Sequence, residues 1–246
     1  MPPSQFIAGA CAGAAAVYAA SKFLAWRRRA LSEKPTFYYY PARGRGEQIR
    51  LTLAEAGVEF EGKYFDMSDP SSKDPYLADC REKGGNLTTN IPMCHIDGVY
   101  RTQSLAVLRY VARKFGLYPE GDIELSYIID NLIEAANDLR SCNYKPMKMM
   151  GGGEKEKKVY LEEALPKHLK NLARLLGSRD YFAGQFTVAD ITLYDALDVS
   201  NRQVPGILAK EYPTLAAFHA RVEARPNIAK WIASEDRAKI FAFPAL

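Results

Sequence analysis

Cysteine and histidine are the residue types in this chain that could bind a metal or carry thiol chemistry. Four cysteines stand alone at positions 11, 80, 94 and 142, and three histidines stand at 95, 168 and 219. Neither a C-x-x-C pair nor a zinc-ligand spacing occurs, so the sequence predicts no metal site and no dithiol redox centre. Isolated thiols are mostly buried small side chains, and they suit a reducing compartment.

Three consecutive tyrosines, Tyr38, Tyr39 and Tyr40, lie in a segment rich in strand-forming residues. Side chains alternate between the two faces of a strand, so Tyr39 should lie on one face and its two neighbours on the other. Cys94 and His95 are also adjacent in a predicted strand and would face opposite ways. We therefore interpret them as hairpin residues and not as a nucleophile with its base.

The elements that must position these residues begin after residue 35. Strands are predicted at 36–40 and 58–65, helices at 47–57 and 76–83, and a hairpin at 91–102 that turns at Asp97-Gly98. Ser104 then caps a helix that ends at Gly116. This order predicts an α/β domain over residues 33–119.

Only helical patterns follow, at 123–140, 154–176, 188–200, 215–224 and 228–234. One helix start is marked by Thr187 with Asp190 three residues later, the pattern of a capping box. Residues 120–246 are therefore predicted to form an all-helical second domain.

The first 32 residues differ from the rest of the chain. Residues 6–26 form an apolar stretch with one charge, Lys22, and Arg27, Arg28 and Arg29 follow it. A helix of this length reaches about 30 Å, the thickness of a bilayer core. The charge order predicts one N-terminal transmembrane helix within a hydrophobic anchor over 1–32, which holds the body on the cytosolic or mitochondrial-matrix side. A cleaved presequence is the alternative.

The folded body carries no net charge. Of the 33 basic and 29 acidic residues, four basic ones precede Glu33, which leaves 29 of each sign in the body. Such a body has no general attraction for polyphosphate, so nucleic acid is excluded as an expected partner.

Four local sequences, in this order, carry a family resemblance: FYYYPARGRGEQIRL, NIPMCHIDG, RTQSLAVLRYVA and FTVADITLYD. Together they resemble the cytosolic glutathione transferases, most closely the sigma class that includes the glutathione-dependent prostaglandin D synthases. The resemblance covers about residues 36–235. It implies a thioredoxin-like N-terminal domain, an all-helical C-terminal domain, a homodimer, and glutathione as co-substrate.

The resemblance implies catalytic roles for two residues of the first motif. The Tyr39 hydroxyl would donate to the glutathione sulfur and favour its thiolate, and Arg45 would position both. Without the resemblance, Tyr39 is a packed strand residue and Arg45 a solvated arginine.

The resemblance further implies a set of glutathione-binding residues, namely Lys83, Thr89, Asn90, Ile91, Pro92, Gln103, Ser104 and Glu134. The Ile91 backbone, before an expected cis proline, would pair with the cysteinyl part of glutathione. Gln103 and Ser104 would hold the γ-glutamyl carboxylate, and Glu134 would reach across the dimer to the amine. Two departures stand out: Asn90 replaces a common lysine, and the tryptophan that contacts the glycyl end has no counterpart.

The sequence thus predicts a membrane-anchored glutathione transferase. It would add glutathione to small hydrophobic electrophiles, or use it in isomerisation or peroxide reduction, in a pocket that includes Tyr144, Met147, Met149 and Met150. The alternative is an accessory or structural subunit of a membrane assembly with little or no catalysis, which the anchor and the missing tryptophan and lysine favour.

Overall fold

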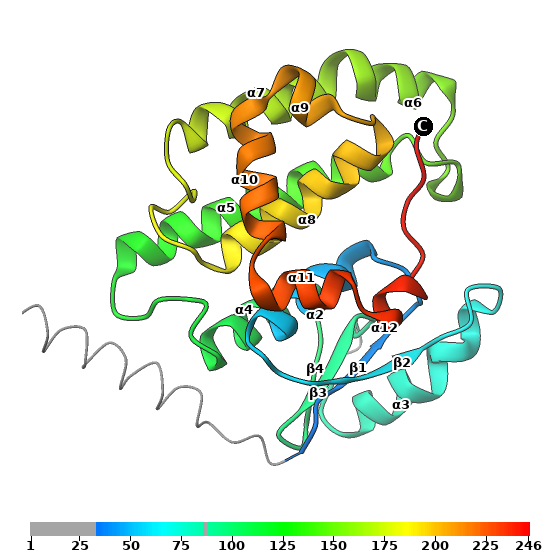
Figure 1. Ribbon diagram of the computed structural model, residues 1–246. Helices are drawn as coiled ribbons and strands as arrows, with labels where there is room; N and C mark the ends of the chain where they lie inside the picture. Colours follow the sequence, from blue (N-terminus) through cyan, green and yellow to red (C-terminus); the bar gives the residue numbers. More distant parts are fainter. Residues whose placement is uncertain (1–32, 86–87) are drawn as a thin grey trace, which may run out of the picture.

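The computed structural model describes residues 33–85 and 88–246 (Figure 1). A four-stranded sheet in the order β2-β1-β3-β4 forms the first half of the body. Strand β1 (Thr36–Tyr39) runs parallel to β2 (Glu61–Tyr64) and antiparallel to β3 (Met93–Ile96), which pairs antiparallel with β4 (Val99–Arg101). This is the predicted thioredoxin-like arrangement.

Two different layers cover the faces of the sheet. The helices α2 (Glu47–Glu55) and α4 (Ser104–Lys114) lie between the sheet and the helical half, whereas α3 (Asp74–Glu82) lies on the other side (Figure 1). Phe37 and Tyr39 accordingly pack against the large core, and Tyr38 and Tyr40 pack against a smaller cluster around Leu77. The predicted alternation of the tyrosines is confirmed.

Helices make up the second half of the body. They are α5 (Ile123–Tyr144), α6 (Glu154–Val159), α7 (Leu165–Leu176), α8 (Val188–Gln203), α9 (Ile207–Glu211), α10 (Pro213–Glu223), α11 (Pro226–Ile232) and α12 (Glu235–Ala238). The two longest, α5 and α8, pack side by side at the centre (Figure 1). The predicted helix at 154–176 is interrupted by a π-helical turn at Tyr160–Ala164.

Short 3-10 turns complete the chain, at Gly44–Gly46, Pro70–Lys73 and Lys148–Met150. The hairpin turn lies where the sequence predicts it, with positive φ at Asp97 (51°) and Gly98 (71°). Strand β2 is shorter than predicted, and Val58, the first predicted strand residue, belongs to the turn that closes α2. Its N–H donates to the Leu53 carbonyl at 2.9 Å while Gly57 adopts φ +69°.

The predicted transmembrane helix concerns residues 6–26, which lie outside the described residues. Within residues 33–85 and 88–246, the helices are too short or too polar to cross a membrane.

The capping box at the start of α8 is confirmed, and it is fully buried. The Thr187 N–H donates to Asp190 Oδ2 at 2.8 Å, and the Ala189 N–H donates to Thr187 Oγ1 at 3.3 Å. Asp190 Oδ1 also accepts from the Phe182 N–H at 3.0 Å, so one carboxylate holds both the helix start and the loop before it. These bonds fix the N-terminus of the central helix.

Replacing Thr187 by Ala removes the capping hydroxyl from this buried site. We expect the free energy of unfolding to fall by about 1–2 kcal/mol, measured by urea denaturation. Thr214→Ala, at an exposed position of α10, is the matched control and should change it by less than about 0.5 kcal/mol. Equal losses in both variants would contradict a specific capping role.

Candidate active site

The segments predicted to contact glutathione converge on one edge of the sheet. Strand β1 ends at Tyr39, and β3 begins at Met93 beside it because the two strands run antiparallel. The Ile91–Pro92 peptide bond, directly before β3, is cis as predicted. Strand β4 ends at Arg101 on the same edge, so the junction with α4 at Ser104 follows there.

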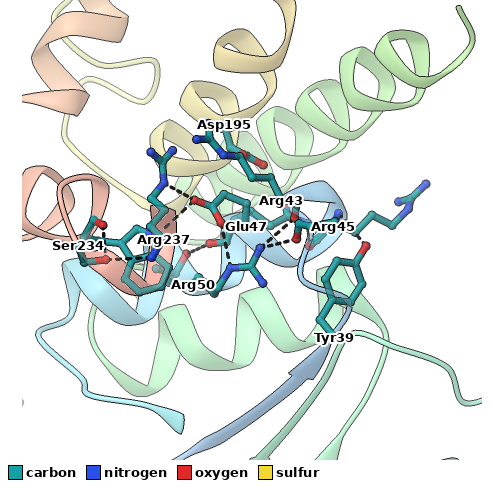
Figure 2. Close-up of polar contacts among 12 residues, drawn as sticks. Tyr39, Arg43, Arg45, Glu47, Arg50, Asp195, Ser234 and Arg237 are labelled. Carbon is teal, nitrogen blue, oxygen red and sulfur yellow. Dashed lines mark hydrogen bonds and ion pairs between the residues drawn. The ribbon is translucent and has the colours of Figure 1, made fainter. Parts of the chain in front are cut away.

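The Tyr39 ring is held by the glycines of the turn that follows β1. A Cβ on Gly44 would lie 2.8 Å from the Tyr39 hydroxyl, and one on Gly46 would lie 2.7 Å from Tyr39 Cδ1. Both glycines are therefore required for the ring to lie against the turn. The backbone N–H of Arg45, between them, donates to the Tyr39 hydroxyl oxygen at 3.1 Å (Figure 2).

The surroundings of Tyr39 keep its hydroxyl protonated. Burial raises the pKa of Tyr39, and the Arg45 N–H and the charges of Arg50, Arg45 and Arg140 offset only part of this effect. Because the phenol oxygen accepts from Arg45, its O–H is left to donate to another group. A protonated phenol at this edge of the sheet can donate a hydrogen bond to an anionic sulfur.

Arg45 links this turn to the helical half. Its Nη1 donates to Asn137 Oδ1 on α5 at 2.9 Å. Asn137 was not predicted as a site residue, because 92 positions separate the two and the sequence carries no local signal for the contact.

A buried ion cluster lies behind the turn, as Figure 2 shows. Glu47 accepts from Arg50 Nε at 2.9 Å and from Arg237 Nε at 2.8 Å. Burial would raise the pKa of Glu47, but the charges of Arg50 and Arg237 outweigh it and lower the pKa. Arg50 also donates to the carbonyls of Ala42 and Arg43, at 2.7 and 3.2 Å, and so fixes the chain just before the turn at Gly44–Gly46.

The backbone N–H of Ile91 is already engaged in the structure. It donates to the side-chain Oδ1 of Asn90 at 2.9 Å. Thr89 is buried, and its carbonyl accepts from Arg81 at 3.3 Å. Asn90 is exposed, so its side chain has space to rotate away from the Ile91 N–H.

The start of α4 differs from the predicted cap. Ser104 is the first helical residue, and the capping position belongs to Gln103, whose side chain makes no capping bond. The prediction that Ser104 caps the helix is therefore wrong. Gln103 adopts φ +70°, an uncommon conformation for a residue other than glycine. The first N–H groups of α4 lack intrahelical acceptors.

Two of the predicted contact residues are paired elsewhere. Lys83 Nζ donates to Asp79 at 2.9 Å, at the end of its own helix. Glu134 Oε1 accepts from Arg109 Nη2 at 2.6 Å, and its side chain is about half exposed. Neither contact involves Tyr39 or Ile91.

The expected electrophile pocket is only partly assembled. Tyr144 and Met147 pack together with Phe243 of the C-terminal tail, whereas Met149 and Met150 are exposed. The tail is bound to the segment just before the turn at 44–46. The Phe241 N–H donates to the Pro41 carbonyl at 2.8 Å, and the Phe241 carbonyl accepts from the Arg43 N–H at 3.0 Å. The sequence analysis did not foresee this tail.

Burial raises the pKa of the described cysteines and so disfavours their thiolate forms. Cys80, Cys94 and Cys142 are buried and unpaired, and burial raises the pKa of Cys94 to about 12. Among the residues that the structure describes, no group of three or more cysteine, histidine or acidic side chains could hold a metal ion.

Comparisons with known proteins agree with this geometry. Residues 35–113 match the family described as "Glutathione S-transferase, N-terminal domain", and residues 138–235 match "Glutathione S-transferase, C-terminal domain". Rat glutathione S-transferase alpha-5 is 33% identical over 214 residues, which is 85% of this chain and 92% of the relative. Rabbit glutathione S-transferase Mu 1 is 33% identical over 219 residues, 85% of this chain and 94% of the relative.

A solved structure gives the same result. The pi-class glutathione S-transferase of Onchocerca volvulus superposes with a TM-score of 0.71 at 27% identity, over 85% of this chain and 96% of that one.

These findings overturn the predicted membrane-anchored localisation. The relatives are glutathione S-transferases matched over nearly their whole length. The prediction of that localisation is wrong.

Replacing Gly46 by Ala tests whether the turn positions Tyr39. The new Cβ would lie 2.7 Å from the ring and 3.0 Å from Phe37 Cζ, so the ring must move away from Arg45. We expect glutathione turnover to fall at least tenfold, by analogy with other small misplacements of catalytic groups. Gly153→Ala, where the new Cβ has ordinary space, is the control. Full activity of Gly46→Ala would contradict this role of the turn.

Proposed function

Because the chain belongs to the glutathione S-transferase family, it is an enzyme that transfers glutathione to electrophiles, and we propose that Tyr39 holds the glutathione sulfur as a thiolate. The observation that carries this proposal is the hydrogen bond from the Arg45 N–H to the Tyr39 oxygen. It leaves the phenol proton for the sulfur. The bond from Arg45 to Asn137 supports a positioning role for Arg45.

The energy that Tyr39 must supply is modest. A thiol has a pKa of about 8.5 in water, so a shift of about two units, equivalent to about 2.7 kcal/mol, makes the thiolate predominant at neutral pH. A hydrogen bond to a charged acceptor contributes about 1.5–3 kcal/mol. One phenol donor is therefore of the right strength.

We propose that glutathione lies along the edge where Tyr39, Pro92 and Ser104 converge. Its cysteinyl backbone would pair with Ile91 after Asn90 rotates away, in the manner of an added strand. Its γ-glutamyl carboxylate would bind the Ser104 hydroxyl and the first N–H groups of α4. The start of α4 follows β4 at the same end of the sheet as Tyr39 and the start of β3, and this supports the placement.

Other parts of the proposal rest on the family resemblance. They are roles for Lys83 and Thr89 in binding glutathione, a domain boundary at residues 119–120, a sigma-like class, isomerisation or peroxide reduction as further reactions, and a homodimer.

Exposed apolar side chains on α5, such as Ile123 (83% exposed) and Tyr127 (66%), support a second copy there. Contact between Glu134 and glutathione across that dimer would require Glu134 to leave Arg109. The comparisons do not favour the accessory-subunit alternative.

Replacing Tyr39 by Phe removes the hydroxyl and keeps the ring. We expect kcat/KM for conjugation to fall at least tenfold while glutathione binding stays nearly unchanged, because the lost interaction favours the thiolate. Tyr40→Phe, on the opposite face of the strand, should keep full activity. If the two variants were equally active, the role of Tyr39 would be refuted.

Replacing Ser104 by Ala should weaken glutathione binding by about 1–2 kcal/mol, because a hydrogen bond to a charged carboxylate is lost. Isothermal titration calorimetry measures the effect directly. Ser126→Ala, on α5, serves as the control. An unchanged dissociation constant in Ser104→Ala would place the carboxylate elsewhere.

A further inference from the structure

The backbone of Arg45 is held by Gln48, a side chain outside the set of residues proposed to bind glutathione. The Arg45 N–H donates to the Tyr39 oxygen at 3.1 Å, and the Arg45 carbonyl accepts from Gln48 Nε2 at 3.2 Å. Gln48 is fully buried in the first turn of α2. The orientation of its side-chain amide therefore bears on whether the Arg45 N–H faces the Tyr39 hydroxyl.

Thr192, on the central helix α8, sets the orientation of that amide. Its hydroxyl donates to Gln48 Oε1 at 2.5 Å, so the Gln48 NH₂ group is left to face the Arg45 carbonyl. An amide turned the other way would bring its oxygen against the Arg45 carbonyl oxygen, and two acceptors repel each other. Thr192 is also fully buried, so water does not compete for these groups.

Arg140, on α5, fixes the direction in which the Thr192 hydroxyl donates. Arg140 Nη2 lies 3.3 Å from Thr192 Oγ1 and 2.9 Å from Asp195 Oδ2. A guanidinium group can only donate hydrogen bonds, so the Thr192 oxygen accepts from it and the Thr192 proton is left for Gln48. Asp195 balances the charge of Arg140, and the two side chains are 5% and 1% exposed.

These contacts form one chain of hydrogen bonds with a single direction. Each group accepts from the one before it and donates to the next, in the order Arg140, Thr192, Gln48, Arg45 and Tyr39. Arg45 takes part with its carbonyl as acceptor and its N–H as donor. Neighbouring bonds in such a chain strengthen one another in a buried, low-dielectric setting. The last donor of the chain is the Tyr39 O–H.

We propose that Gln48 and Thr192 are positioning residues for the transfer reaction. They hold the Arg45 backbone so that its N–H occupies a lone pair of the Tyr39 oxygen and the Tyr39 proton points to the glutathione sulfur. This inference rests on the proposed function of Tyr39. Neither Gln48 nor Thr192 contacts glutathione, so their loss weakens the stabilisation of the thiolate and leaves the binding of glutathione intact.

Replacing Thr192 by Val removes the hydroxyl and keeps the shape of the side chain. We expect kcat/KM for conjugation to fall about tenfold, as for other small misplacements of a catalytic group, with an unchanged dissociation constant for glutathione. The pH at which half of the bound glutathione is ionised, measured from the ultraviolet absorbance of the thiolate, should rise by about one unit. Thr192→Ser keeps the hydroxyl and should recover most of the activity.

Ser200→Ala is the matched control. It removes another fully buried hydroxyl of α8, which donates to Asn143 Oδ1 at 3.1 Å and lies outside the chain of bonds to Tyr39. It should lower the free energy of unfolding to a similar extent and leave turnover and thiol ionisation unchanged. Gln48→Met removes the next bond of the chain and should reproduce the kinetic effect of Thr192→Val.

A Tyr39→Phe background separates this inference from the proposed function. Adding Thr192→Val to Tyr39→Phe should cause no further loss of activity, because the chain acts only through the Tyr39 hydroxyl. Full activity of Tyr39→Phe alone would refute both the role of Tyr39 and the inference. With Tyr39→Phe impaired, full activity or unchanged thiol ionisation in Thr192→Val, an equal kinetic loss in Ser200→Ala, or a further loss in the double variant would overturn the inference alone.

Discussion

The buried carboxylate of Glu47 links the sheet-containing half of this molecule to the helical half. It accepts hydrogen bonds from Arg50 of its own helix and from Arg237, which lies 190 positions later in the chain. The Trp231 indole N–H donates to the same carboxylate at 3.3 Å. Removing one partner of such a buried ion pair costs about 3–5 kcal/mol, because it leaves an uncompensated charge. One side chain therefore joins α2 to both α11 and α12, and through Arg50 it holds the chain that leads into the turn at Gly44–Gly46.

A second polar contact zone runs along α8. Thr192 Oγ1 donates to Gln48 Oε1 at 2.5 Å, Asp195 accepts from Arg140 at 2.9 Å, and Asp198 accepts from Arg43 at 3.1 Å. The three α8 residues recur every three positions and so lie on nearly one side of the helix. Arg43 and Gln48 bracket the turn at Gly44–Gly46. The position of that turn, and hence of Tyr39, is set by a helix more than 140 residues away in sequence.

The parts of the fold that were predictable are those encoded locally. Strand alternation placed Tyr39 and Tyr38 on opposite faces, Asp97-Gly98 marked the hairpin, and Thr187 with Asp190 marked the start of α8. Local patterns did not show the pairing of Glu47 with Arg237 or of Arg45 with Asn137, because these partners meet only after the chain has folded. The same limit applies to Ser104, where the motif was visible but the backbone conformation at Gln103 moved the cap by one residue. The assignment of Tyr39 to chemistry came from a family resemblance, since periodicity shows only which face it occupies.

The hydrogen bonds of Phe241 to Pro41 and Arg43 bear on how the chain folds during its synthesis. Chains emerge from the ribosome N-terminus first, and the N-terminal part begins to fold before the rest is made. Pro41 and Arg43 form backbone hydrogen bonds with Phe241. Glu47 forms its ion pair with Arg237, which is also synthesised late. A nascent chain can form its sheet early, but the turn at residues 44–46 lacks these contacts until residues 237–241 have been synthesised. Termination shortly before residue 237 would thus yield a polypeptide that lacks the contacts of Arg237 with Glu47 and of Phe241 with the turn after β1.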